Sequence, residues 1–298
     1  MARPNYVLVT PARNEAQFLG LTLASVIAQT HRPLKWVIVS DASTDATDDL
    51  VREAAANHPF IELVRREADV KRAFSSKVFA IREGVKKFEG MPYDYIGNLD
   101  ADLSFEPTYF EELFSRMEAA PKLGIAGGMI HERESITGHL QLIETDKSVA
   151  GAVQMFRRAC YEQIGGYIPL RYGGIDAAAE FNARMHGWET RTYMDLLVGH
   201  HRRMGSAGRG IFLSFYDMGI REAALGYHPL FEVFRSANRM SASPMVIGGI
   251  VQFAGYVLAK IRREPIALSP ECVKHLHKEQ MARLKGFFGL KQRSRSTI

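Results

Sequence analysis

Four short runs of β-branched and aromatic residues in the first third of the chain constrain its fold most. Stretches with the spacing of amphipathic helices separate these runs. The expected strands are 5–10, 34–40, 61–66 and 93–99, and the expected helices are 16–30, 44–55 and 74–88. Strands that alternate with helices in this way pair in parallel, because each connection crosses the sheet. The sequence therefore predicts an α/β fold with a mostly parallel sheet flanked by helices.

The pattern loosens in the middle of the chain. Residues 124–130 and 190–201 are expected strands, residues 152–167 a strand followed by a helix, and residues 171–189 a loop followed by a helix. We expect the α/β domain to cover residues 1–208 and a helical, amphipathic extension to cover residues 209–298.

The extension contains residues 245–261, the longest nearly uncharged run of the chain. A membrane-spanning helix needs about 20 apolar residues, whereas this run is shorter and includes Gln252 and three glycines. It therefore predicts an interfacial or core helix. Residues 271–290 mix basic and apolar positions as an amphipathic surface helix does.

The formal net charge of +5 is unevenly distributed, because residues 255–298 contain ten Lys or Arg and three Glu. Apolar area together with basic charge supplies the two signals that stable membrane attachment requires. We therefore expect peripheral binding to an anionic membrane surface at its cytoplasmic face. A solvated tail and a homodimer formed through these helices are the alternatives. No nucleic-acid-binding motif accompanies the charge, so nucleic acid is not an expected partner.

Composition agrees with a cytoplasmic globular protein. Hydrophobic residues make up 46% of the chain and charged residues 24%, as in proteins with a sizeable core. Cys160 and Cys272 are too few for a disulfide framework and are expected to be buried thiols in a reducing compartment. The N-terminal residues contain no long apolar run, so no signal peptide is expected.

Polar segments follow three of the expected strands, at residues 11–15, 40–45 and 99–103. Ligands of such sheets bind beyond the carboxyl ends of the strands, so these segments predict a site. The third segment contains Asp100 and Asp102, two like charges one residue apart. Paired carboxylates suit Mg²⁺ or Mn²⁺ together with a diphosphate. An acidic turn is the alternative reading.

These motifs together resemble those of family 2 glycosyltransferases with the GT-A fold. Pro11-Ala12-Arg13-Asn14-Glu15 is similar to the family's P-x-x-N-E, and Ser40 to Asp45 is similar to its D-D-G-S-T-D. Lys77 lies in a basic segment like the family's K-G-x-A-x-N-x-G, and Asp100-Ala101-Asp102 resembles its metal-binding D-x-D. The resemblance covers residues 5–205 and implies an inverting sugar transfer from a nucleotide-diphosphate donor.

The resemblance also implies roles for individual residues. Nucleotide-binding residues would be Pro11, Ala12, Arg13, Glu15, Asp41, Lys77 and Asp100. Asp41 would accept a hydrogen bond from the base, which suits the N3–H of uracil and favours UDP. Asp102, with Asp100, would bind Mn²⁺ or Mg²⁺, and either His200 or His201 would complete the metal site.

Sugar transfer needs a base that takes the proton of the acceptor hydroxyl. In the family this base is an Asp in an E-D motif near the start of a helix, and residues 174–184 contain no such pair. Asp176 and Glu180 are the candidates, and the position of Asp176 at the start of the helix favours it. Acceptor-side residues implied by the resemblance are Arg157, Arg158, Gly165 and Gly166.

The sequence also departs from the family pattern. Ser40 replaces an Asp, Ala42 replaces a Gly, and Arg82 stands where Asn is usual. The Q-x-x-R-W signature of processive members is absent, which favours addition of a single sugar.

The expected function is therefore metal-dependent transfer of one sugar to a lipid-linked or surface-glycan acceptor. A non-catalytic nucleotide-sugar-binding module is the alternative, because the E-D motif is missing. A sugar nucleotidyltransferase is disfavoured, since residues 11–15 contain no glycine to cradle a triphosphate.

Overall fold

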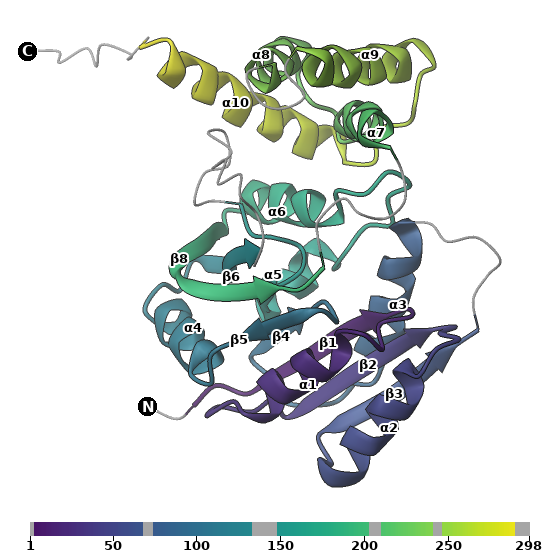
Figure 1. The fold of residues 1–298 in the computed structure, drawn as a ribbon. Coiled ribbons are helices and arrows are strands. Elements are labelled where there is room, and N and C mark those ends of the chain that lie inside the picture. Colours follow the sequence, from purple (N-terminus) through teal and green to yellow (C-terminus); the bar gives the residue numbers. More distant parts are fainter. Residues whose placement is uncertain (1–2, 68–73, 133–147, 203–209, 241–245, 290–298) are drawn as a thin grey trace, which may run out of the picture. The chain divides into compact units, whose positions relative to one another are not determined.

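A computed structural model describes residues 3–67, 74–132, 148–202, 210–240 and 246–289. The chain divides into two compact units, Met1–Ala207 and Gly208–Ile298. Figure 1 shows the elements of both units.

The first half of the N-terminal unit alternates strands and helices as predicted. Its elements are β1 (Tyr6–Ala12), α1 (Leu19–Ile27), β2 (Lys35–Asp41), α2 (Thr47–Asn57), β3 (Ile61–Arg66), α3 (Phe74–Lys86) and β4 (Tyr95–Asn98). The second half contains β5 (Leu103–Phe105), α4 (Tyr109–Glu118), β6 (Leu123–Glu132), β7 (Met155–Arg157), α5 (Arg158–Ile164), α6 (Ile175–Met185) and β8 (Glu189–His200). Of these elements, β5 and α4 were not predicted from the sequence.

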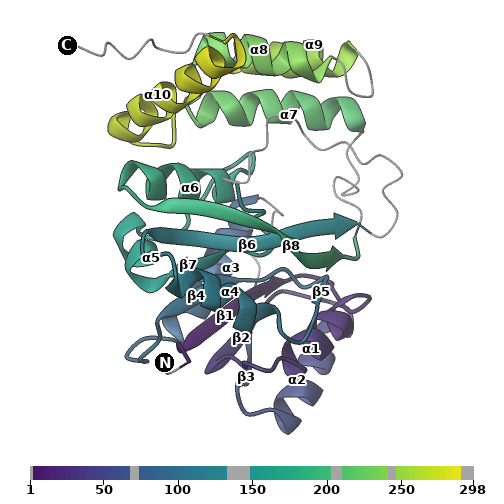
Figure 2. The ribbon, with the colours of Figure 1, turned by 90° about the vertical axis from the view of Figure 1, so that its left-hand side faces the viewer.

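The strands form one sheet in the order β3-β2-β1-β4-β7-β6-β8-β5. β3, β2, β1 and β4 pair in parallel, as do β6 and β8. The pairs β4–β7, β7–β6 and β8–β5 are antiparallel. Figure 2 shows the long strands β6 and β8 side by side. The predicted mostly parallel α/β sheet is therefore confirmed, with antiparallel pairings in its second half.

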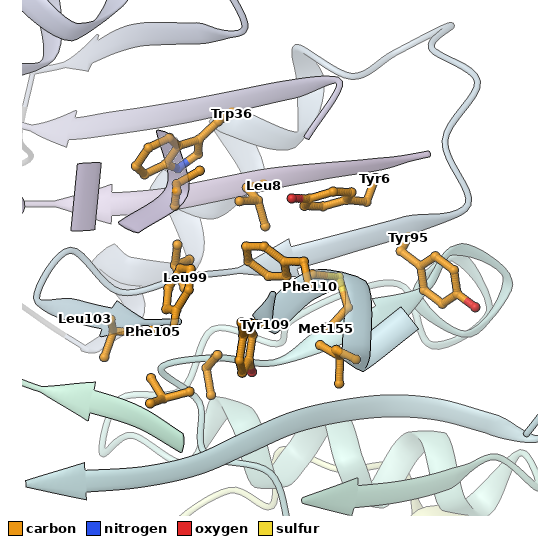
Figure 3. Packing of buried hydrophobic residues seen from close by; sticks show 14 of the residues in the cluster. Tyr6, Leu8, Trp36, Tyr95, Leu99, Leu103, Phe105, Tyr109, Phe110 and Met155 are labelled. Carbon is orange, nitrogen blue, oxygen red and sulfur yellow. The ribbon is translucent and has the colours of Figure 1, made fainter. Parts of the chain in front are cut away.

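The two faces of the sheet are covered by different helices, because side chains alternate along each strand. Tyr6 and Leu8 of β1 belong to a buried cluster that includes side chains of α1, α2 and α4, much of it visible in Figure 3. Val9 points to the other face, where α3 packs. A Cβ atom on Gly84 of α3 would lie 2.4 Å from a methyl carbon of Val9, so this close approach requires glycine.

The C-terminal unit is helical and consists of α7 (Ile211–Ala224), α8 (Pro229–Arg239), α9 (Ile247–Ile261) and α10 (Pro270–Phe287). α9 and α10 coincide with the two segments singled out in the sequence. His228 caps the start of α8 and Ser269 caps the start of α10, each with proline in the first turn. Over the described part of the chain, the helices are too short or too polar to cross a bilayer.

Candidate active site at the carboxyl ends of the strands

The carboxyl ends of β1, β2 and β4 lie at one edge of the sheet. Ala12 pairs with Ser40, and Val9 pairs with Asn98, so the polar segments that follow these strands are neighbours. Pro11 and Ala12 are the last residues of β1. The structure thus brings the three predicted polar segments together at the edge where sheets of this kind bind ligands.

Asp41 lies at the outer part of this edge between two guanidinium groups. Arg66 Nη1 is 3.0 Å from Asp41 Oδ1, and Arg13 Nη1 is 3.6 Å from Asp41 Oδ2. The carboxyl group is almost completely buried. Arg66 was not singled out in the sequence, because only the pairing of β3 with β2 places it beside Asp41.

The loops after β1 and β2 are tied together by hydrogen bonds. The backbone N–H of Thr44 donates to Asn14 Oδ1 at 2.8 Å, and the N–H of Asn14 donates to Ser43 Oγ at 3.1 Å. The N–H of Glu15 donates to Thr47 Oγ1 at 2.8 Å. These bonds fix the backbone beside Asp41, whose carboxylate is held separately by Arg66 and Arg13.

Asp100 and Asp102 follow β4 and have different partners. Lys77 Nζ, from α3, lies 2.6 Å from Asp100 Oδ1. Asp102 is nearly buried, and its pKa is raised by burial first and by the charge of Asp100 second. The repulsion expected from the sequence is therefore present, and Lys77 offsets only the Asp100 side of it.

The two histidines at the end of β8 play different roles. His200 Nε2 lies 3.5 Å from Asp102 Oδ1, and its buried Nδ1 atom has no hydrogen-bond partner in the parts of the chain that the structure describes. His201 Nε2 instead bonds to Ser104 Oγ at 2.8 Å. His200 is thus the histidine closer to the acidic pair.

Arg202, which belongs to none of the sequence motifs, also lies at the site. Its guanidinium contacts the carboxylate of Glu15, and its Nε lies 3.8 Å from Asp102 Oδ2. Burial raises the pKa of Glu15 to about 7, the charge of Arg202 opposes this rise, and Asp102 adds to it. A basic residue directly after the His200–His201 pair was the available signal in the sequence.

Asp100 and Asp102 have the chemistry that a divalent cation needs, but with His200 they are not arranged around a common point. Within the described residues, no group of three or more His, Cys, Asp or Glu side chains is placed to hold a metal. His200 Nε2 faces Asp102, and a cation bound between them would offset the repulsion that Asp100 exerts on the charge of Asp102. Asp102 and His200, with Asp100 beside them, would leave coordination positions for the oxygens of a diphosphate, which is how Mg²⁺ sites are usually completed.

Glu180 of α6 is buried in a hydrogen-bonded pocket. The N–H of Val149 donates to Glu180 Oε1 at 2.5 Å, and Gln154 Nε2 lies 3.3 Å from the same oxygen. Arg184 Nη1 is 3.5 Å from Oε2. Burial raises the pKa of Glu180 to about 8. A carboxyl group that is 2% exposed is poorly placed to reach an acceptor.

Asp176 is half-buried at the start of α6 and lies against the loop that borders the acidic pair. A Cβ atom on Gly151 would lie 2.9 Å from Asp176 Oδ2. The next residue, Ala152, accepts a hydrogen bond from the N–H of Asp100 at 2.9 Å. The structure therefore places Asp176, unlike Glu180, at a partly open position beside the strand ends.

Tyr167 belongs to none of the sequence motifs and lies near the carboxylates of Asp176, Asp100 and Glu180. Its hydroxyl donates to Gln154 Oε1 at 2.7 Å, and its carbonyl accepts from Arg82 Nη2 at 3.1 Å. Burial raises its pKa well above the usual value, and the charges of Asp176, Asp100 and Glu180 add to the rise. Gly165 and Gly166, with φ of 71° and 69°, form the turn that leads into Tyr167.

Arg157 and Arg158 are not brought to this edge. Arg157 pairs with Tyr95 at the first residue of β4, and its guanidinium lies 5.1 Å from the centre of the Tyr95 ring. The N–H of Arg158 donates to the carbonyl of Asp94. Both arginines therefore lie at the opposite end of β4 from Asp100 and Asp102.

The family model described as "Glycosyl transferase family 2" matches residues 7–165 of the sequence. A poly-beta-1,6-N-acetyl-D-glucosamine synthase of Staphylococcus epidermidis is 29% identical over an alignment of 173 residues, and the match covers 51% of this chain and 39% of that protein. The synthase of Staphylococcus aureus strain COL is 28% identical over the same shares. The chain thus spans well under half the length of these curated relatives.

Solved structures resemble the whole chain more broadly. A mannosyltransferase of Pyrobaculum calidifontis in complex with GDP-Man and Mn²⁺ has a TM-score of 0.57 at 17% identity, covering 99% of this chain and 82% of that one. S. aureus TarS 1-349 in complex with UDP-GlcNAc has a TM-score of 0.58 at 11% identity, covering 95% and 92%. GalNAc-T7 with UDP, GalNAc and Mn²⁺ has a TM-score of 0.60 at 15% identity, covering 96% and 58%. At these identities the likeness establishes the GT-A fold alone.

Proposed function

Because the chain belongs to glycosyl transferase family 2, we propose that it transfers a single sugar from a nucleotide-diphosphate donor to an acceptor hydroxyl, with inversion at the anomeric carbon. The observation that carries the proposal is the meeting of Asp100 and Asp102 with Lys77, His200 and Arg202 at the carboxyl edge of the sheet. Two carboxylates beside an imidazole and two cations suit a metal–diphosphate group.

The nucleoside would lie in the outer part of the edge, beside Pro11, Ala12, Arg13 and Glu15. There the carboxylate of Asp41 is held between Arg13 and Arg66, and it can accept a hydrogen bond from the N3–H of uracil. UDP is therefore the favoured donor nucleotide. Of the neighbours named above, one is a complex with UDP-GlcNAc and another is a complex with GDP-Man, so a donor panel must include GDP-sugars.

Asp102, His200 and Asp100 would hold Mn²⁺ or Mg²⁺, while His201 is turned towards Ser104. When bound, such an ion supplies Lewis-acid stabilisation of the leaving diphosphate. Lys77 and Arg202 add positive charge on the same side. Lys77 reaches Asp100 from α3, so its ammonium lies where it can also contact phosphate oxygens.

Asp176 would act as the general base. It accepts the proton of the acceptor hydroxyl as the oxygen forms its bond to the anomeric carbon and the bond from that carbon to the diphosphate breaks. A single displacement of this kind inverts the anomeric configuration. Glu180 is the less suitable base because it is enclosed by Val149, Gln154 and Arg184.

The acceptor would be lipid-linked or part of a surface glycan, and the C-terminal unit would bring the enzyme to an anionic membrane surface. Support comes from the apolar run and the excess of basic residues in the last part of the sequence. Addition of one sugar is favoured because the sequence contains no Q-x-x-R-W motif. The curated relatives are named as synthases of a polymer, so product length is a direct check on this point.

The test is nucleotide release from UDP-, GDP- and dTDP-sugars, with Mn²⁺ or with EDTA. We expect release from one donor that is lost with EDTA and in Asp102→Asn. Asp176→Asn should lose transfer by about 100-fold or more, as expected for a missing base, whereas Glu180→Gln should retain most activity. Asp49→Asn, at an exposed position of α2, is the matched control.

Three outcomes would contradict the proposal or part of it. Metal-dependent nucleotide binding by calorimetry, with no turnover of any donor across a panel of glycan and lipid-phosphate acceptors, would indicate a binding module. Absence of nucleotide binding altogether would exclude both functions. Loss of activity in Glu180→Gln with retention in Asp176→Asn would reverse the assignment of the base.

A further inference from the structure

α9 exposes its large apolar residues and buries its small and polar ones. The exposed residues are Ile247, Ile250, Phe253, Leu258 and Ile261, and the buried residues are Gly248, Gly249, Gln252, Gly255, Tyr256 and Ala259. A surface helix of a protein in water shows the opposite arrangement, with its apolar face towards the core. The pattern indicates that something other than water covers the exposed face.

The exposed apolar residues form one continuous stripe. At 100° per residue they fall within an arc about 140° wide. The most exposed of them, Ile250 at 52% and Ile261 at 70%, lie three turns apart along the helix. Isolated exposed apolar residues need no explanation, but a stripe along a whole helix does. We call this stripe the α9 face.

The opposite side of α9 packs through backbone contacts. A Cβ atom on Gly219 of α7 would lie 1.9 Å from the carbonyl oxygen of Gln252, and one on Gly255 would lie 2.3 Å from that of Tyr216. A Cβ atom on Gly249 would lie 2.3 Å from the carbonyl oxygen of Ser236 in α8. Close packing through small residues is typical of helices that associate in a lipid environment.

Polar groups lie inside this helical unit. Gln252 Nε2 donates to Glu222 Oε2 at 2.8 Å and lies 3.3 Å from Glu232 Oε1. Arg235 Nε is 2.6 Å from Glu222 Oε1. All four side chains come from α7, α8 and α9. The helical unit therefore has polar contacts in its interior and apolar side chains on the exposed α9 face.

The charge at the end of α9 identifies the kind of surface. Lys260, Arg262 and Arg263 are exposed at and just beyond its C-terminus. Basic residues beside an apolar stripe match a bilayer that contains anionic lipids.

We propose that the α9 face inserts into the surface of an anionic bilayer with the helix lying in the plane of the membrane. A helix of 15 residues is about 22 Å long, too short for a hydrocarbon core of about 30 Å. The inference rests on the proposed function only in that a membrane-borne acceptor gives the contact its purpose.

The first experiment measures co-sedimentation of the full chain with vesicles of phosphatidylcholine alone or with phosphatidylglycerol added. We expect binding to the anionic vesicles that weakens as salt is raised. The variant Ile250→Gln/Ile261→Gln should bind at least about tenfold more weakly, because two side chains no longer transfer into the apolar layer. Glutamine keeps a high helix propensity, so α9 should remain folded, which circular dichroism checks.

A matched variant in the N-terminal unit is Leu21→Gln/Leu34→Gln, since these leucines are exposed to 46% and 42%. It should bind vesicles as the wild type does. A second readout uses an environment-sensitive dye on Ile250→Cys, whose emission should shift to the blue on addition of anionic vesicles. The same dye on Leu34→Cys should not shift.

Three results would overturn the inference. They are no binding to anionic vesicles at low salt, equal loss of binding in both double variants, or a dimer of the wild-type chain that the α9 variant abolishes while vesicle binding is unchanged. Donor hydrolysis in solution separates this inference from the proposed function. Hydrolysis without vesicle binding contradicts only the α9 proposal, and vesicle binding without turnover contradicts only the transferase.

Discussion

Ala42 holds a left-handed backbone conformation, with φ of 51°, in the loop between β2 and α2. Its N–H donates to the carbonyl of Arg66 at 3.0 Å, which fixes the conformation beside Asp41. A residue with a Cβ atom is strained there by about 1–2 kcal/mol, whereas glycine is not. The alanine is the departure from the family's D-D-G-S pattern noted in the sequence.

We therefore expect Ala42→Gly to stabilise the protein, by up to about 1 kcal/mol once the greater entropy of an unfolded glycine is subtracted. The midpoint of urea unfolding measures the effect. Ala55→Gly, inside α2, is the matched control and should destabilise by about 1 kcal/mol. A less stable Ala42→Gly would show that the loop gains nothing from glycine.

Glu180 predicts a pH dependence of stability. Its pKa is raised by burial to about 8 in the folded protein, against about 4.3 in an unfolded chain, so the native state binds the proton more tightly. The stability from this group is full below the unfolded pKa and is lost as the pH rises to about 8. Glu180→Gln removes the loss, so its free energy of unfolding relative to wild type should rise between pH 5 and pH 8.

Denaturant unfolding at several pH values tests this expectation for Glu180. Glu53→Gln, at an exposed position of α2, is the matched control measured at the same pH values. A difference from wild type that stays constant with pH for Glu180→Gln would mean that Glu180 is ionised when folded.

At the scale of elements, glycine sets how closely the C-terminal helices approach. Gly219 of α7 meets the backbone of α9, whereas a Cβ atom on Gly286 of α10 would meet nothing within 4 Å. Gly219→Ala should lower the free energy of unfolding by about 1–3 kcal/mol, as overpacking does. Gly286→Ala should raise it by about 0.5–1 kcal/mol through helix propensity. The midpoints of thermal unfolding of both variants test these expectations. Similar midpoints for the two variants would show that the close approach of α7 to α9 does not require glycine.

Elements with a strong local pattern were predictable, and those made by distant pairing were not. β1, β2, β3 and α3 follow from apolar runs and helical spacing. β5 has three residues and exists because it pairs with β8, which no local pattern encodes. α4 was missed although Phe110, Phe114 and Met117 of its buried face recur at helical spacing.

The candidate site divides in the same way. Lys77, Asp41, Asp100 and Asp102 stand in local motifs, and the structure gathers them at one edge. Arg66, Tyr167 and Arg202 reach that edge only through strand pairing and chain reversal. The preference for Asp176 over Glu180 gains support from burial, a property of the packed molecule.

For the whole molecule, ligand binding should raise thermal stability, because only the folded state binds. UDP with Mn²⁺ at about a hundredfold excess over its dissociation constant would stabilise by about 2.7 kcal/mol, a shift of several degrees in the melting temperature. EDTA and Asp102→Asn should each remove the shift, and Asp49→Asn should keep it. An equal shift with EDTA present would show that binding needs no metal.

The pairing of β5 with β8, and the contact of Glu15 with Arg202 across 187 residues, set an order of events during synthesis. Asp100 and Asp102 leave the ribosome well before β8, the strand that pairs with β5 directly after them. At about 5–20 residues per second, the wait lasts roughly 5–20 s. A nascent chain that ends before His200 carries every motif of the first hundred residues but has no closed site. A message that terminates before the codon of His200 therefore yields a product in which neither His200 nor Arg202 lies beside the acidic pair.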